Sequence, residues 1–281
     1  MFPLRLLRTA RRVLPAKSLS TSGQLTDLTV DNEGIATLTL QRAPVNSLNV
    51  ELLQELTTVL GQVEKDKAKG LVLTSASPSV FSAGLDITEM YNPNVERLTA
   101  LWTSLQDLWA KLYSAPYPTA VAINGHAPAG GCMMALCCEY RTMVSGRYTI
   151  GLNETAVGIP VPEWLIGTMC KVISQREAEV ALNAGLMFTV EEALKIGLID
   201  ETATDKADAI EKSKKFIKRF DKISPIAHSL TKQRFRSDVL QRFAKNREAD
   251  LNQFKYVVLQ PEVQELLGQI IQKLKQKKAA K

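Results

Sequence analysis

The sequence predicts an α/β fold followed by a helical region. Two observations support this class: short apolar β-type runs alternate with segments of helical spacing up to residue 204, and helical periodicity with high charge fills residues 205–281. The chain has 281 residues, of which 45% are hydrophobic and 23% charged. That composition excludes wholesale disorder and fibrous structure. We therefore expect a core over 23–204 and a C-terminal helical region over 205–281.

The expected strands are short and rich in apolar or β-branched residues, and the first two flank a hairpin signal. They are Asp27–Val30, Ile35–Leu40, Gly70–Thr74, Thr119–Ile123, Tyr140–Val144 and Tyr148–Leu152.

The expected helices begin at residues that cap well. Asn49 precedes an apolar stripe at helical spacing, and a long amphipathic helix is predicted over Val95–Tyr113. A Gly/Pro turn over 124–131 leads into a helix that continues through Cys138. Ser174 and Thr189 each begin the pattern of a capping box.

Several common chemistries are excluded by missing motifs. The sequence contains no GxxxxGK[ST], GxGxxG or GxSxG motif. It has two His and four Cys with no CxxC or HExxH spacing, so we expect no metal site and no resident cofactor. The Cys pattern indicates free thiols of a reducing compartment.

The net charge of +6 is concentrated at the N-terminus. Residues 1–24 hold five basic residues and no acidic one, whereas the rest of the chain holds 30 basic and 29 acidic residues. A nearly neutral body predicts no nucleic-acid binding. The Arg-rich, Ser/Thr-containing, acid-free leader predicts a mitochondrial transit peptide over 1–22, with a retained basic tail as the alternative.

A long uncharged stretch, 112–138, does not predict a transmembrane helix. It is interrupted by Pro116, Pro118, Asn124, Gly125 and Pro128, and backbone broken in lipid would leave polar groups unsatisfied. We expect a buried strand, a tight loop and a buried helix there, and no transmembrane segment.

Three segments could carry chemistry. The small residues of FSAGLD (81–86) would let a ligand approach the backbone, with Asp86 capping a helix that begins at Ile87. The Gly pair in the turn 124–131 opens a helix and offers free N–H groups. Glu154 follows an apolar strand. Taken singly, these segments are better explained as an ordinary turn, a common helix start and an exposed strand end.

Four strings in one order give these segments a common context. They are PVNSLNVELL (44–53), VFSAGLDITEM (80–90), AINGHAPAGGCMMAL (122–136) and IGLNETAVGI (150–159). With them the chain resembles the crotonase (enoyl-CoA hydratase/isomerase) superfamily from about residue 30 to residue 200, and more weakly in the helical tail.

This resemblance implies a spiral of repeated β-β-α units, a homotrimer and an acyl-CoA thioester substrate, with coenzyme A as part of the substrate. It implies an oxyanion hole made by the backbone N–H groups of Leu85 and Gly130, and Glu154 as the catalytic base. The residues expected to line the bound thioester are Ser82, Ala83, Gly84, Leu85, Asp86, Gly130 and Asn153.

The resemblance also separates the reactions of the family. Hydratases place a second glutamate in the helix after the Gly pair, where this chain has Met133. Adding water needs two positioned groups, whereas one carboxylate can shuttle a proton from C2 to C4. We therefore expect a Δ3,Δ2-enoyl-CoA isomerase of β-oxidation in the mitochondrial matrix. Hydratase or dienoyl-CoA isomerase activity, or acyl-CoA binding without catalysis, are the alternatives.

Two further residues in these segments are assigned no chemistry. His126 lies inside the glycine turn, and we expect no catalytic role for it. Glu163 is a second acid, but it lies near an expected helix start, where carboxylates are favoured by the helix dipole.

Overall fold

Two sheets form the frame of the molecule. The computed structural model describes residues 25–279, so the predicted transit peptide lies outside the described residues. The main sheet has the strand order β1-β2-β3-β4-β6-β9, with β1 and β2 antiparallel and the other pairs parallel. A second sheet has the order β5-β7-β8. The strands are β1 (Thr26–Val30), β2 (Ile35–Leu40), β3 (Gly70–Ser75), β4 (Thr119–Ile123), β5 (Ala127–Pro128), β6 (Tyr140–Val144), β7 (Thr149–Gly151), β8 (Phe188–Thr189) and β9 (Glu201–Ala203).

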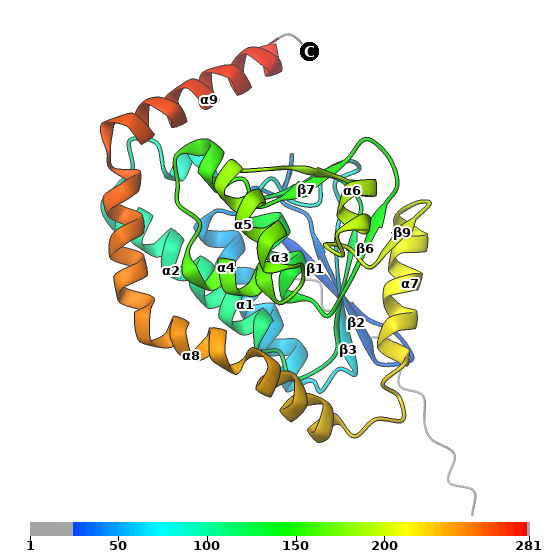
Figure 1. Ribbon diagram of the computed structural model, residues 1–281. Coiled ribbons are helices and arrows are strands. Elements are labelled where there is room, and N and C mark those ends of the chain that lie inside the picture. The colour runs from blue at the N-terminus through cyan, green and yellow to red at the C-terminus, as the bar shows by residue number, and fades with distance from the viewer. Residues whose placement is uncertain (1–24, 280–281) are drawn as a thin grey trace, which may run out of the picture.

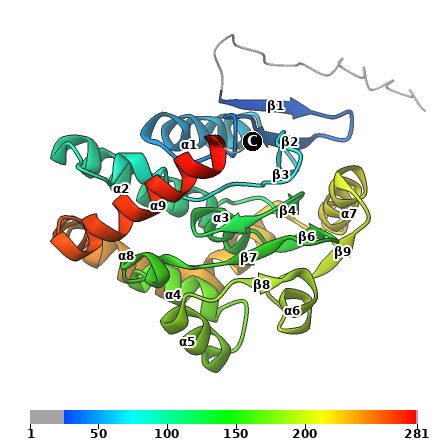
Figure 2. The same ribbon diagram turned by 90° about the horizontal axis from the view of Figure 1, so that it is seen from above.

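Helices cover both faces of the main sheet. Figure 1 shows α1 to α5 on one side and α7 on the other, with α8 and α9 running along the outside, and Figure 2 shows the same separation from above. The helices are α1 (Val50–Lys65), α2 (Val95–Tyr113), α3 (Gly130–Cys137), α4 (Glu163–Cys170), α5 (Gln175–Ala184), α6 (Val190–Lys195), α7 (Lys206–Lys218), α8 (Pro225–Val258) and α9 (Pro261–Ala279), with 3₁₀ turns η1 (Ile87–Glu89) and η2 (Glu154–Val157).

The burial pattern agrees with this layering. One large apolar cluster fills the space between the sheet and α1 to α4, and it includes Trp109 and Phe81, which are fully buried. A smaller cluster lies on the other face, where Ile217 of α7 packs against sheet residues such as Val72. The sheet is thus covered on both faces, as expected for parallel strands such as β3 and β4, in which every residue is buried. This α/β architecture is the fold class that the sequence predicts.

Capping residues set the helix boundaries. The Asn49 side chain accepts a hydrogen bond from Leu52 N, and Thr189 and Glu192 form a reciprocal capping box. Ser174 accepts from the Glu177 amide without the reciprocal bond. Gly185 ends α5 in the left-handed conformation that favours glycine.

The shortest strands differ from the expectations. The sequence predicts a strand over Tyr148–Leu152, but β7 covers only Thr149–Gly151. No strand is expected at β8 or β9, which have two and three residues. Segments this short contain no readable alternation, and they are strands only because β7 and β6 lie beside them.

The N-terminal half of α8 is held to the core by basic side chains spaced four residues apart. Lys232 is buried and donates to Tyr117 O (2.8 Å) and to Glu139 Oε2 (2.7 Å), while Glu139 Oε1 contacts His228 Nε2 (2.8 Å). Burial opposes ionisation of Glu139, but His228 and Lys232 outweigh it and lower its pKa to about 2. Arg236 donates to the carbonyl of Tyr113, the last residue of α2, and to the carbonyl of Cys137, the last residue of α3.

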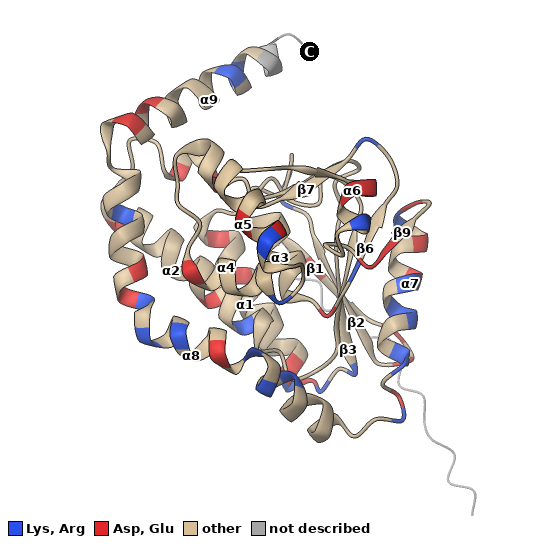
Figure 3. Ribbon diagram, viewed as in Figure 1, with Lys and Arg blue, Asp and Glu red and all other residues tan. Residues whose placement is uncertain are grey.

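The outer helices are rich in charged residues. Figure 3 shows both acidic and basic residues along α7 and α8. Over residues 25–279, none of the helices is both long enough and apolar enough to cross a bilayer.

Among the glycines near the Gly/Pro turn, Gly125 lies closest to another segment of backbone. A Cβ at this position would lie 2.1 Å from the carbonyl carbon of Ser79, whereas a Cβ at Gly61, inside α1, would meet no atom within 4 Å. We expect Gly125→Ala to lower the free energy of unfolding by about 1–3 kcal/mol or more. Gly61→Ala is the matched control and should raise it by about 1 kcal/mol.

Urea unfolding of the two variants checks this expectation. Equal effects of the two substitutions would show that the loop 79–86 does not pack against the turn as closely as the structure has it.

Candidate active site

The first loop, 79–86, lies directly against the Gly/Pro turn. Phe81 N donates to His126 O (2.9 Å) and His126 N donates to Ser79 O (3.0 Å), which forms a parallel bridge between Val80 and His126. The absence of a side chain at Gly125 permits this close approach. Val80 and His126, which are 46 positions apart in the chain, therefore lie side by side.

The second sheet connects the same turn to Glu154. In the β5–β7 pairing Ala127 lies opposite Ile150 and Pro128 opposite Gly151, and Ala129 N donates to Gly151 O (2.8 Å). Gly130 follows this pairing by two residues on one strand, and Glu154 follows it by three on the other. The structure thus brings together all three segments that the sequence singles out.

The amides of Leu85 and Gly130 lie close together. A Cβ built on Gly84 would be 3.2 Å from Gly130 N, and one built on Gly130 would be 3.7 Å from Leu85 N. Within residues 25–279 neither amide donates a hydrogen bond. Gly130 is the first residue of α3, so its N–H is among those that a helix leaves unsatisfied. Two neighbouring free donors can bind one oxygen that carries negative charge.

The backbone beside these two amides is strained at Ala129. Ala129, which precedes α3, has φ 47° and ψ −117°, a conformation in which a residue with a Cβ is rare. Gly84 also has a positive φ, of 79°, and its carbonyl accepts from Leu48 N (2.8 Å). Strain of this kind persists only where the surroundings hold it, and it is common at functional sites.

The expected thioester-lining residues differ in their surroundings. Ser82 is buried, and its hydroxyl donates to Asn46 O (2.8 Å) and accepts from Gly84 N (3.3 Å), so this side chain shapes the loop. Ala83 N donates to Val45 O (3.0 Å). The Asp86 carboxylate caps η1 through the Thr88 amide and pairs with Arg42 (3.0 Å). Asn153 is half-buried immediately before η2, and its side chain forms no hydrogen bond with any residue of 25–279.

Glu154 is half-buried at the start of η2. One of its carboxylate oxygens, Oε2, is enclosed and has no hydrogen-bond partner in the described part of the chain. Burial raises the pKa of Glu154 to about 7, against an ordinary value of 4.5. The carboxylate lies near the start of α3, where burial, and then the charge of Glu154, raise the pKa of the Cys132 thiol. Met133, the next residue, is fully buried.

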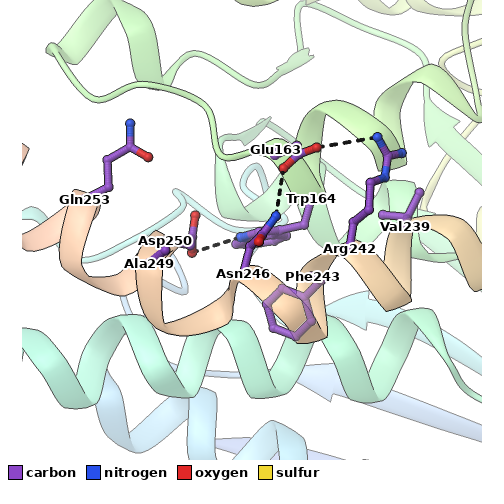
Figure 4. Close-up of a pocket in the computed structure, with 9 residues that line it drawn as sticks. All are labelled: Glu163, Trp164, Val239, Arg242, Phe243, Asn246, Ala249, Asp250 and Gln253. Atoms are coloured by element: carbon purple, nitrogen blue, oxygen red, sulfur yellow. Dashed lines mark hydrogen bonds and ion pairs between the residues drawn. The ribbon is translucent and has the colours of Figure 1, made fainter.

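Glu163 lies elsewhere, and its surroundings are polar. Figure 4 shows its carboxylate turned toward Arg242 and Asn246 of α8, at 3.5 Å and 3.4 Å. The Glu163 side chain is 60% exposed. An exposed, paired carboxylate at the start of α4 agrees with the expected helix-start role. In the same view Asp250 accepts from the Trp164 indole (3.1 Å), so it too is occupied.

Helix α9 contacts both 3₁₀ turns that flank the site. Gln264 donates to Met90 O (2.9 Å) and accepts from Asn92 N (2.8 Å), next to η1. A Cβ at Gly158, which ends η2, would lie 3.1 Å from the Leu266 side chain. The C-terminal helix therefore braces the segment after Leu85 against the segment that begins with Glu154.

Comparison with known proteins identifies the family. A family model described as enoyl-CoA hydratase/isomerase matches residues 30–278. The chain belongs to this family. It is 40% identical to mitochondrial enoyl-CoA delta isomerase 1 of Mus musculus over 247 residues, which cover 87% of this chain and 85% of that protein.

The fold is similar to solved structures of the family. The crystal structure of human mitochondrial Δ3-Δ2-enoyl-CoA isomerase matches with a TM-score of 0.88 and 38% identity, covering 91% of this chain and all of that one. A probable enoyl-CoA hydratase of Bacillus subtilis is 31% identical over 68% of this chain and 74% of its own length. The spiral crotonase-like fold expected from the resemblance is confirmed.

Two features of the site have no clear sequence signal. The strained backbone at Ala129 has none, because alanine is common in all conformations that L-residues favour. The link from Asp86 to Arg42 joins residues on separate loops, and each of them alone is an ordinary surface charge. His126 has only a weak sequence signal, which is its position inside the Gly/Pro turn.

The raised pKa of Glu154 leads to a prediction about stability. Because the folded-state pKa of Glu154 is raised, ionisation is disfavoured in the folded protein, and the resulting destabilisation grows from pH 4.5 to about pH 7. Glu154→Gln should therefore raise the free energy of unfolding at pH 8 by about 1–3 kcal/mol, and by less at pH 5.

Denaturant unfolding at the two pH values measures this difference. The exposed Glu163→Gln serves as control and should change stability by at most about 0.5 kcal/mol at either pH. A Glu154 variant that is equally stabilised at pH 5 and pH 8 would contradict the raised pKa.

Proposed function

We propose that this chain is a Δ3,Δ2-enoyl-CoA isomerase that converts 3-enoyl-CoA to trans-2-enoyl-CoA in fatty acid β-oxidation. The observation that supports this proposal best is the enclosed, unpartnered Oε2 of Glu154 beside an α3 that carries Met133 where hydratases carry a second acid. Relatives at 38–40% identity carry the name enoyl-CoA delta isomerase 1.

The proposed reaction is a proton transfer from C2 to C4 by one base. The Glu154 carboxylate removes a proton from C2, next to the thioester, and the electron pair passes into the carbonyl to give an extended enolate. The protonated Glu154 then returns the proton to C4, the carbonyl re-forms, and the double bond now joins C2 and C3. A pKa near 7 suits both halves of this transfer at neutral pH.

The enolate would be stabilised by the free amides of Leu85 and Gly130. A C2 proton is far less acidic than a carboxylic acid, so a base alone is insufficient. Each such donor is typically worth about 10²–10³ in rate. Both donors belong to the main chain. They lie side by side because Gly84 closely approaches Gly130, which follows the strained Ala129. Ser82, Ala83, Gly84, Asp86 and Asn153 are proposed to line the bound thioester.

Met133 is proposed to favour isomerisation over hydration. A thioether neither activates water nor donates a proton, so it cannot supply the second group that hydration needs. It also contributes to the apolar surroundings that raise the pKa of Glu154 and exclude water.

We further propose a mitochondrial matrix location, a homotrimer and no separate cofactor, with coenzyme A part of the substrate. The mammalian relatives are named mitochondrial, and residues 1–24 have the composition of a transit peptide. A carboxylate and two amides supply the proton transfer and the charge stabilisation that the reaction requires, so the proposed chemistry leaves no step to a cofactor.

The central test is the Glu154→Gln variant with 3-hexenoyl-CoA. We expect a loss of about 10²–10⁴ in kcat with the thioester still bound, because only the base is removed. Deuterium uptake from D₂O at C2 and C4 of the product, followed by mass spectrometry, should fall in parallel. Glu163→Gln is the matched control and should retain the wild-type rate.

Two results would overturn the assignment. Turnover retained by Glu154→Gln would mean that another group is the base. Rapid formation of 3-hydroxyacyl-CoA from 2-enoyl-CoA, with little isomerisation, would make the protein a hydratase.

The pH dependence of wild-type kcat/KM gives an independent check. The base must be ionised in the free enzyme, so activity should rise through about pH 7 and be constant above it. Steady-state assays between pH 5 and 9 measure this, and a profile that is flat over the whole range would exclude Glu154 as a base of raised pKa.

A further inference from the structure

His126 is the residue at which the three segments of the site are joined. Its backbone makes both hydrogen bonds to the first loop, to Ser79 O and from Phe81 N. Its side chain reaches the opposite way, to the strand that leads to Glu154. We infer that His126 is a positioning residue, which fixes the distance between the oxyanion amides and the base; this inference rests on the proposed isomerase function.

The side-chain contact is specific in its chemistry. Thr149 N donates to His126 Nδ1 at 3.2 Å, and the Thr149 hydroxyl lies 3.1 Å from the same nitrogen. A backbone N–H can only donate, so Nδ1 must accept and the imidazole carries its proton on Nε2. The Tyr148 ring packs edge-on against the imidazole, with centroids 5.4 Å apart, and limits its rotation.

This contact extends a pairing that is otherwise very short. The β5–β7 ladder has two residue pairs, Ala127 with Ile150 and Pro128 with Gly151. His126 precedes β5 and Thr149 is the first residue of β7, so the imidazole supplies a third pair in the same register. Proline cannot donate to the ladder, which makes the additional bond more important.

The consequence lies a few residues further along each strand. Gly130 and Glu154 both follow the ladder directly, and their separation is set by its register and by the hydrogen bond from Ala129 N to Gly151 O. Without the imidazole the pair of His126 with Thr149 loses both contacts at Nδ1, and Thr149 N is left without an acceptor. A slight shift of β7 would then move the carboxylate relative to the amides, and the proton transfer depends steeply on this geometry.

The test compares three substitutions at position 126. In His126→Asn the amide oxygen is attached to Cγ, as Nδ1 is, so it can accept from Thr149 N. In His126→Gln the acceptor is one atom further out, and in His126→Ala there is none. We expect His126→Ala and His126→Gln to lose roughly 10- to 100-fold in kcat with KM changed by at most about twofold, while His126→Asn keeps most of kcat.

A fall in kcat at nearly constant KM distinguishes a positioning role of His126 from a role in folding alone. Active sites are counted by titration with a thioether acyl-CoA analogue, so that a partly unfolded sample does not lower the measured kcat. Tyr148→Phe is the matched control: it keeps the ring against the imidazole and should leave kcat unchanged. The assay is conversion of 3-hexenoyl-CoA by the full chain.

The possible results distinguish this inference from the function on which it depends. Wild-type protein that does not isomerise 3-hexenoyl-CoA would overturn both. Normal isomerisation by wild type, loss in Glu154→Gln and full kcat in His126→Ala would overturn the inference alone. Equal impairment of His126→Asn and His126→Ala would also overturn it, since the acceptor would then be irrelevant.

Discussion

The parallel pairing of β5 with β7 is the constraint on which the site depends. It consists of two residue pairs and one further hydrogen bond from Ala129 N, yet it places the start of α3 beside the turn that begins with Glu154. So short a ladder has little stability of its own. It is held because its neighbours are fixed: α3 is buried in the main core, and β8 pairs with the other side of β7.

Two unfavourable features coexist at this point of the structure. Ala129 has a backbone conformation that L-residues rarely adopt, and Glu154 has a carboxylate oxygen without a partner. Each lowers stability, and the large core between the sheet and α1 to α4 offsets them. The same two features suit the proposed chemistry, because the Gly130 N–H next to Ala129 has no acceptor within residues 25–279 and the Oε2 atom of Glu154 is free to take up a proton. Local departures from the rules of folding are therefore expected here more than elsewhere.

Sequence reasoning predicted the parts of the molecule that carry their own signal. The helix over 95–113 and the strand over 119–123 have residue patterns long enough to read, and the structure has them at the same bounds. The strands β8 and β9 exist because of neighbours and have no pattern of their own. At the candidate site, motif order pointed to Leu85, Gly130 and Glu154, whose catalytic roles stay a prediction, whereas the contact of His126 with Thr149 depends on a register that no local pattern encodes. The docking of α9 on η1 has no sequence signal either, because the polar residue Gln264 makes the contact.

The number of enclosed carboxylates restricts what this fold can catalyse. The family supports several reactions on one backbone, so the backbone amides alone do not select between them. A second acid near Glu154 would supply the proton that hydration delivers to carbon, and two like charges in one pocket would also shift each other's pKa. In α3 this chain has the buried Met133 and no second acid, and burial is the main influence on Glu154, whose pKa it raises to about 7. In the proposed reaction a single carboxylate with this pKa would remove and return the proton, and a transfer between two carbons of the same substrate requires no more.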